Sequence, residues 1–332
     1  MYREAKLRYP ELENHIEKVL TGEANFAPIY VVFGDDDYLK ELAVKRFAAM
    51  LDKDYADFNL AKFEKTASVD DVKDALDTYP MFDSVKVVVQ YFDDKPSEEV
   101  KKFVDEYVKA PVPTSVFVIV ADGEASKSFT SKKMERIDCS HLEDSELVYE
   151  INKILFKEPS CVIEPNAAEE LILRTQHDMA RIVSETEKLK AYAEGRITKA
   201  DVENMVTPDV EYKVYELAEA ISKKDGTTAL NMLAKLYEDG FKGVTLMNRI
   251  YDRYRNMFFS RVNKDMRNDE LAQALGIKAG AVYYLRKTAE NYSPVRLKKC
   301  VEFLHSLLYD VLSGKRLEAS AVQEAVLGLL AM

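Results

Sequence analysis

The sequence predicts an α/β domain with a mostly parallel sheet, followed by purely helical domains. Apolar runs alternate with amphipathic helical segments up to about residue 140, no strand pattern follows, and the helical segments lengthen from about residue 210. Strands that are buried on both faces by flanking helices have such near-continuous apolar runs. We therefore expect three domains, which span residues 1–140, 141–210 and 211–332.

The elements of the first domain follow in order along the chain. Residues 1–20 are charged and have a helical pattern, which predicts a helix that covers the domain. Ser68 begins a later helix as an N-cap, with Asp71 at the third helical position. Another helix, "PSEEVKKFVDEYV", opens with a proline and acidic residues. Apolar runs predict strands at 28–34, 57–63, 85–90, 115–121 and, more weakly, 135–139.

The remaining chain reads as helices only. Short helical patterns fill residues 141–210, where Gly195 marks the end of one helix. Longer patterns follow, such as "VTLMNRIYDRYRNMFFSRV".

Composition narrows the class of protein. Hydrophobic residues make up 47% and charged residues 32% of the chain, and no apolar run approaches the roughly 18 residues that a membrane span needs. The three cysteines are far apart and odd in number, which suggests reduced thiols in a cytoplasmic protein. The four histidines are scattered without metal-ligand spacing. We expect no metal, no cofactor and no membrane contact.

The charge is distributed unevenly. The net charge of −11 argues against a general nucleic-acid binder. However, residues 241–300 contain 13 basic and 5 acidic residues, so this segment carries +8 and the remainder −19.

The first strand and helix are joined by an acidic turn. A phosphate-binding loop needs several glycines, a lysine and a hydroxyl, but "FGDDDYLK" at 33–40 supplies only Gly34, and Lys40 falls inside the next helix. Three carboxylates would repel a triphosphate, although they suit a helix N-terminus. The turn keeps the strand–turn–helix frame without the ligand chemistry.

A second segment partly matches the phosphate-loop pattern. In "ADGEASKS" (121–128), Lys127 and Ser128 match, but Ala121 and Ser126 replace the required glycines. We expect no ATP hydrolysis by this chain; a divergent ATPase using Lys127 and Ser128 is a rival hypothesis.

The short connection in "TYPMFDSVKVVVQ" (78–90) carries two large apolar residues, Met81 and Phe82. Connections lie on the surface. Either these side chains fold back over the end of the sheet, or they are anchors for a pocket on a partner protein.

Residues 268–293 resemble a helix-turn-helix. Val282 would face inward and Arg286 and Lys287 outward, which supports a hypothesis of DNA binding. The positions that would read bases offer little hydrogen-bonding chemistry: Lys278, Ala279, Ala281 and Tyr283. The basic charge could equally serve an oligomer interface, or contact DNA phosphates without reading sequence. A helix-turn-helix regulator with an α/β sensor domain is the alternative function.

Several segments together resemble the delta subunit of bacterial DNA polymerase III, a component of the clamp loader. The resemblance covers nearly the whole chain. It is carried by "IYVVFGDDDYL", "TYPMFDSVKVVV", "VSETEKLKAYAEGRITKADV", "VYELAEAISKKDGTTALNMLAKLYEDG", "LAQALGI" and "LYDVLSGKR", in this order.

The resemblance implies a RecA-like domain of the AAA+ type at 1–140, a small helical lid at 141–210 and an all-α collar at 211–332. It also implies a non-catalytic subunit without a working ATP site that opens the beta sliding clamp. Met81 and Phe82 match the clamp-binding pair, with Tyr79 and Pro80 beside them in the site. The implied partners are this clamp, the tau/gamma and delta prime type subunits through the collar, and primed DNA in weak contact without sequence preference.

Overall fold

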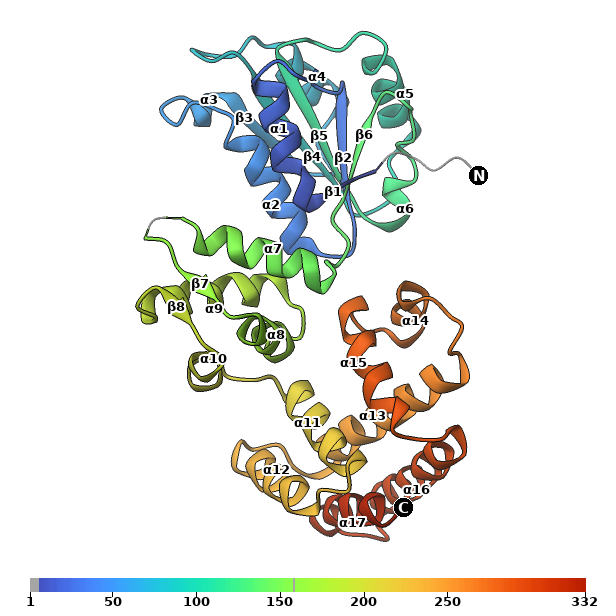
Figure 1. Cartoon of the computed structure of the whole chain (residues 1–332). Coiled ribbons are helices and arrows are strands. Elements are labelled where there is room, and N and C mark those ends of the chain that lie inside the picture. The colour runs from blue at the N-terminus through green and yellow to red at the C-terminus, as the bar shows by residue number, and fades with distance from the viewer. Residues whose placement is uncertain (1–5, 158) are drawn as a thin grey trace. The chain divides into compact units, whose positions relative to one another are not determined.

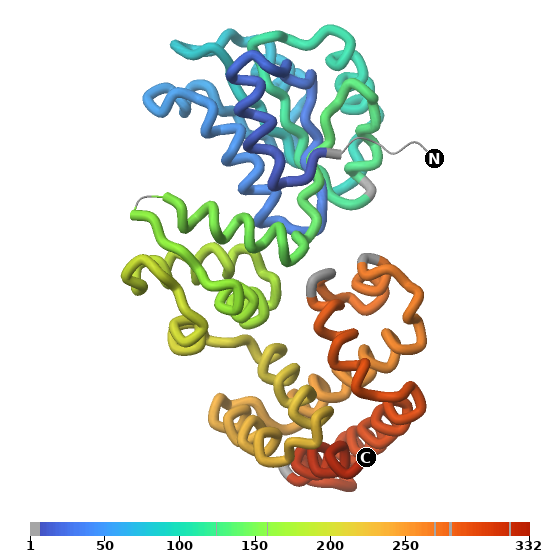
Figure 2. Tube along the Cα trace, viewed as in Figure 1, coloured from blue at the N-terminus to red at the C-terminus, as the bar shows by residue number. Residues whose placement is uncertain are grey.

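The computed structural model describes residues 6–157 and 159–332 (Figure 1). The chain divides into two compact units, one up to His141 and one from Leu142 onward. Figure 2 traces the chain through each unit, first the mixed α/β part and then the helical part. The division into three domains at 140 and 210 stays a prediction.

The first unit contains one six-stranded sheet in the order β1-β6-β2-β5-β4-β3, and all neighbouring strands run parallel. The predicted α/β, RecA-like architecture with a parallel sheet is confirmed. The strands are β1 (Lys6–Arg8), β2 (Ile29–Phe33), β3 (Leu60–Phe63), β4 (Lys86–Phe92), β5 (Ser115–Ala121) and β6 (Glu135–Asp138). Helices surround the sheet (Figure 1): α1 (Leu12–Leu20), α2 (Asp37–Ala48), α3 (Ala56–Asn59), α4 (Val69–Asp77), α5 (Glu98–Tyr107) and α6 (Gly123–Ser126).

The central strands are the apolar runs of the sequence, because both of their faces are covered. Every residue of β5 is buried, as are all but one of β2 and of β4. Local signals fix where the helices begin. The Ser68 hydroxyl accepts the Asp71 N–H at 3.1 Å, and Ser97 caps α5 in the same way through Val100.

Two predictions in this unit are wrong in detail. The helix expected over residues 1–20 begins only at Leu12. Residues 6–8 instead form β1, which pairs with β6 at the sheet edge, and residues 1–5 lie outside the described part of the chain. The strand expected at 57–63 starts at Leu60, since residues 56–59 form α3. Edge elements of three or four residues are too short to show a periodic pattern.

The second unit is almost entirely helical. Its helices are α7 (Asp144–Leu155), α8 (Pro165–Arg174), α9 (Met179–Tyr192), α10 (Lys199–Met205), α11 (Val210–Ser222), α12 (Gly226–Glu238), α13 (Gly243–Val262), α14 (Asn268–Leu275), α15 (Ala279–Glu290), α16 (Pro294–Leu312) and α17 (Glu318–Ala331). The expectation of no strands here is wrong, because β7 (Val162–Ile163) and β8 (Arg196–Ile197) form a short parallel pair. Gly195 has a left-handed conformation, but α9 ends earlier, at Tyr192 with the extended C-cap Ala193, so the helix end predicted at Gly195 is wrong by two residues.

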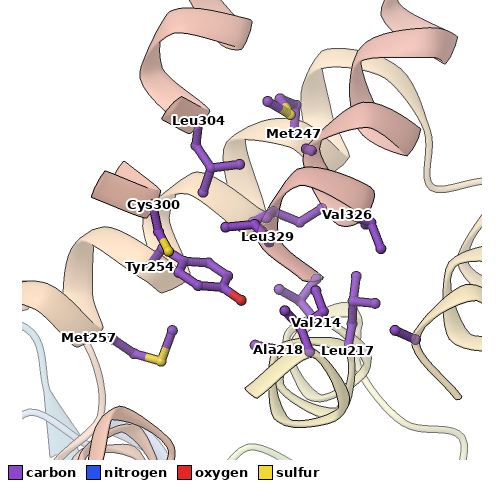
Figure 3. Close-up of a cluster of buried hydrophobic side chains, with 14 of the residues drawn as sticks. Val214, Leu217, Ala218, Met247, Tyr254, Met257, Cys300, Leu304, Val326 and Leu329 are labelled. Atoms are coloured by element: carbon purple, nitrogen blue, oxygen red, sulfur yellow. The ribbon is translucent and has the colours of Figure 1, made fainter. Parts of the chain in front are cut away.

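One large apolar core holds the C-terminal helices together. Leu217 of α11, Met247 and Tyr254 of α13, Leu304 of α16 and Leu329 of α17 converge in it (Figure 3). Tyr254 is fully buried, and its hydroxyl lies 3.1 Å from that of Tyr292, so this polar group is satisfied inside the core. Across the described residues, no helix combines the length and apolar character that crossing a bilayer requires.

Candidate functional site

The loop between α4 and β4 presents apolar side chains to solvent. Tyr79 is 82% exposed, Met81 47% and Phe82 77%, while Pro80 is half-buried. The alternative that Met81 and Phe82 fold back over the sheet is therefore wrong. Because the loop precedes β4 in a parallel sheet, it lies at the amino ends of the strands, at the opposite end from the acidic turn that follows β2.

A buried asparagine holds the backbone of this loop. The Met81 N–H donates to Asn59 Oδ1 at 2.7 Å, and Asn59 Nδ2 donates to the Met81 carbonyl at 2.9 Å. Asn59 is fully buried at the end of α3 and also donates to the Tyr55 carbonyl at 3.2 Å. One side chain thus satisfies both backbone groups of Met81, so the loop is ordered before any partner arrives.

Phe82 is held in a conformation that is uncommon for an aromatic residue. Its φ is 54°, in the left-handed region, which costs a non-glycine residue about 1–3 kcal/mol. The ring lies 5.0 Å from that of Tyr55 at an interplanar angle of 40°, so Tyr55, the residue that precedes α3, supports Phe82. Backbone strain of this kind concentrates at binding sites, where the surrounding structure fixes it.

Asp83 ties the far end of the loop to its surroundings. Its carboxylate accepts the N–H of Asp52 at 2.7 Å and that of Ser84 at 2.6 Å. Loss of hydration opposes the charge, but these donors outweigh it and hold the pKa of Asp83 below its usual 3.8. The carboxylate is therefore ionised, and the anchor is intact, at neutral pH.

The supporting residues Tyr55, Asn59 and Asp83 escaped the sequence analysis. Asn59 could have been noticed, because an asparagine inside the apolar run "DFNLAKF" would be buried and would need hydrogen-bond partners.

We expect Asn59→Ala to loosen the loop without unfolding the unit. It removes both hydrogen bonds to Met81 and leaves that backbone unsatisfied, at a cost of about 1–3 kcal/mol of stability. Thermal unfolding with amide hydrogen exchange of residues 79–84 measures this. Asp57→Ala, on the same short helix, is the control with no expected change. Unchanged exchange in Asn59→Ala would contradict the assigned role.

The carboxylates of the acidic turn bind groups of the chain itself, including His141. Asp36 caps α2 by accepting the Leu39 N–H at 3.0 Å, and its carboxylate lies 3.3 Å from His141 Nδ1. Asp35 accepts the His141 N–H at 3.2 Å. Asp37 pairs with Lys40 at 2.8 Å. All three carboxylates of the turn therefore have partners within the first unit.

Lys40 is committed to the same network. It is buried in α2 and ion-pairs with Asp122, which follows β5. Burial opposes its charge, but hydrogen bonds to Asp122 and Asp37 outweigh this and raise the pKa of Lys40 above 10.5. Within the described residues, the lysine that lies nearest in sequence to the turn is thus bound to carboxylates instead of being aimed at an open loop.

The second phosphate-loop candidate does not form a loop. Residues 123–126 are the short helix α6, and Ser126 and Ser128 donate their N–H groups to the carbonyls of Asp122 and Ala125 at 3.2 and 3.0 Å. The Ser126 hydroxyl donates to the Gly123 carbonyl at 2.9 Å. Backbone donors that would wrap a phosphate are therefore already used.

The helix-turn-helix segment does form two helices, α14 and α15, joined through Gly276 with a φ of 65°. Lys278 forms an ion pair with Asp178 at 3.2 Å, and Arg286 donates to the Lys264 carbonyl at 2.9 Å. Tyr283 is exposed and Ala281 half-buried; the side chain of Ala279 lies outside the described residues. The cationic groups proposed to read or approach DNA are largely engaged within the chain.

Comparison with known families decides where the chain belongs. Residues 30–140 match the family described as DNA polymerase III, delta subunit, and residues 211–329 match the DNA polymerase III delta subunit, C-terminal domain. The chain belongs to the DNA polymerase III delta subunit family. Together the two matches span well over half of this delta-family chain, and the first includes both the acidic turn and the exposed loop.

One solved structure has the same fold over nearly the whole chain. The Bacillus subtilis DNA clamp loader delta protein is 21% identical, with a TM-score of 0.70 over 97% of this chain and 100% of that one. A Thermotoga maritima RuvB variant is 12% identical, with a TM-score of 0.38 over 84% of both chains. No curated protein sequence gave a match to this delta-family chain.

Proposed function

We propose that this chain is the clamp-opening subunit of a clamp loader. It binds the sliding clamp through Met81 and Phe82, with Tyr79 and Pro80 at the edge of the contact, and helix α4 levers one interface of the ring apart. The single observation that carries the proposal is the exposed apolar pair on a loop whose backbone is already fixed, in a member of the delta family.

The loop has the properties of a binding hot spot. A fixed backbone avoids part of the entropy cost of ordering a loop on binding. A protruding aromatic ring beside a flexible methionine can fill a small apolar pocket, at roughly 2–4 kcal/mol per residue. Asn59 and Tyr55 act as positioning residues. Asn59 holds the backbone of Met81, and Tyr55 packs against the ring of Phe82.

The proposal assigns this chain no ATP hydrolysis. Its acidic turn is filled by residues 139–141, and Lys40 is paired with Asp37 and Asp122. ATP bound to the other subunits would control when the clamp-binding loop is presented. The rival ATPase that uses Lys127 and Ser128 has no support in the geometry of α6.

The C-terminal helices are proposed to pack against tau/gamma and delta prime type subunits. Helices α16 and α17 and their connection expose apolar side chains that a partner would cover, including Leu312, Leu317 and Leu327. The basic segment 241–300 would contact primed DNA weakly through phosphates. The alternative of a helix-turn-helix regulator is not favoured by any observation on α14 and α15.

A titration of the purified chain with the sliding clamp of the same organism, in the absence of nucleotide, tests the proposal. We expect a stoichiometric complex by native mass spectrometry, and increased separation of fluorophores placed across one clamp interface. A parallel assay should find no ATP hydrolysis by the chain alone. Failure to form a complex, or a complex with a closed ring, would contradict the proposed function.

A further inference from the structure

Two lysines are buried in the described residues of the first unit, and only one of them is neutralised. Lys40 and Lys86 are each 5% exposed. Lys40 pairs with Asp37 and Asp122, and these carboxylates raise its pKa. Lys86, the first residue of β4, has neither an ion pair nor a hydrogen bond through its ammonium within the same residues. A buried cation without a counter-ion is costly, which makes Lys86 a candidate for a function beyond the fold.

Lys86 faces the last turn of α4, the helix that precedes the exposed loop. It pairs with Ser115 of β5, whose hydroxyl donates to the Leu76 carbonyl of α4 at 2.6 Å. Two residues further along β4, and so on the same face, Val88 belongs to the same core cluster as Leu76. The lysine side chain therefore leaves the sheet on the face that α4 covers.

The neighbour of Lys86 on the other side holds the loop itself. Leu60 of β3 pairs with Val87 of β4, so Asn59, directly before Leu60, comes next to Lys86. Asn59 holds the Met81 backbone through two hydrogen bonds. Lys86 thus lies between the contact that fixes the end of α4 and the contact that positions the exposed pair.

The ammonium of Lys86 has accessible surface although the rest of its side chain is enclosed. The polar atoms that are sealed from solvent without a partner in the described part of the chain do not include its Nζ. Lysine side chains commonly bury their methylene groups and keep the charged end at the surface. An anion beside the loop can therefore meet this ammonium without a rearrangement of the fold.

The local fold does not neutralise the charge. Burial lowers the pKa of Lys86 below its usual 10.5, and no carboxylate of the described residues counteracts this. The end of α4 offers only about half an elementary negative charge, and no carbonyl within the described residues accepts from the ammonium. A carboxylate within hydrogen-bond reach would supply the full charge that is missing.

We propose that Lys86 binds a carboxylate of the sliding clamp when Met81 and Phe82 enter the clamp pocket. This inference rests on the proposed function and adds a charge-specific contact to the apolar one. The apolar pair suits any pocket of the right size, whereas Lys86 selects a clamp with an aspartate or glutamate at the rim of that pocket. A basic residue at the rim would be rejected, because it would approach a cation that is already uncompensated.

Surface plasmon resonance of the full chain on the sliding clamp of the same organism tests the role of Lys86. Lys86→Met keeps most of the apolar stem and should weaken binding at least tenfold, because it removes a charge-assisted hydrogen bond. Its affinity should also fall less with added salt than that of the parent chain. Lys62→Met removes an exposed lysine of β3, and this matched control should bind as the parent does.

The outcomes separate this inference from the proposed function. If the parent chain binds the clamp and Lys86→Met binds equally well, the inference is wrong and the proposed function stands. If the parent chain does not bind the clamp, both are wrong.

Two further measurements distinguish a direct contact from a loosened loop. Amide hydrogen exchange of residues 79–84 should be the same in Lys86→Met as in the parent, whereas Asn59→Ala should increase it. Lys86→Met should unfold at the same or a higher temperature than the parent, because it removes an uncompensated buried charge. Faster exchange or a lower unfolding temperature in Lys86→Met would show a structural role and contradict the proposal.

The carboxylate can be located on the clamp by the same binding assay. Each aspartate and glutamate at the rim of the clamp pocket is replaced in turn by its amide and tested against both chains. One replacement should weaken binding of the parent at least tenfold but leave binding of Lys86→Met unchanged, because the charge pair is already lost there. If no replacement depends on Lys86 in this way, the proposal is overturned.

Discussion

Replacing Met81 and Phe82 together by alanine is expected to weaken binding to the sliding clamp about 100-fold or more. The effect is large because both side chains are exposed in the free chain and would be buried in the clamp. The fold should survive, because neither residue belongs to the buried core. Surface plasmon resonance on immobilised clamp, alongside thermal unfolding, measures both quantities.

Two further variants make this result specific. Phe156→Ala removes a phenylalanine that is 68% exposed in the second unit, and it should bind the clamp normally. Phe82→Gly relieves the left-handed strain at φ 54° while it removes the anchor ring. It should therefore lose affinity without losing stability. Affinity that survives in the double alanine variant would show that the loop is not the clamp-binding site.

The exposed pair could be found from the sequence because its signal is local. Pro80 follows the end of α4 by three residues, β4 begins six residues after Pro80, and the two large apolar residues between them belong to no strand or helix. What holds the pair could not be found in this way. Asn59 and Tyr55 lie more than 20 residues away, and their contacts with the loop depend on β3 and β4 being neighbours in the sheet.

The same limit explains the missed elements. The central strands β2, β4 and β5 are long and apolar because both faces are covered, so composition alone identifies them. Strand β1 has three residues, and β7 and β8 have two each. Their backbone groups are paired because of where the chain brings them, and so no periodic pattern marks them in advance.

The acidic turn meets requirements of the local fold. Its carboxylates were predicted to suit a helix N-terminus, and Asp36 caps α2 as expected. No local pattern predicted that residues 139–141 cross the turn and use Asp35 as an acceptor. A side chain at position 34 would collide with this segment, because the backbone of Gly34 lies against the backbone of Cys139 and Ser140.

Gly34→Ala is expected to destabilise the first unit by more than about 3 kcal/mol, or to prevent its folding. Gly34 has a φ of 139°, which side chains rarely tolerate, and an added Cβ would lie well inside 3.0 Å of the carbonyl carbon of Cys139 and the nitrogen of Ser140. Both obstacles are backbone atoms, and they belong to a segment that is fixed by the 2.6 Å hydrogen bond from the Cys139 N–H to the Phe33 carbonyl. The new methyl group cannot be accommodated by a rotamer change.

Gly22→Ala is the matched control for this prediction. Gly22 also has a positive φ, of 80°, but no atom lies within 4 Å of an added Cβ. Its substitution should cost only the left-handed strain, about 1–2 kcal/mol. Urea unfolding of the two full-length variants compares the losses, because both glycines have a positive φ and only Gly34→Ala adds the collision. Equal losses would mean that residues 139–141 can move away, and the acidic turn would then be an open site instead of a filled one.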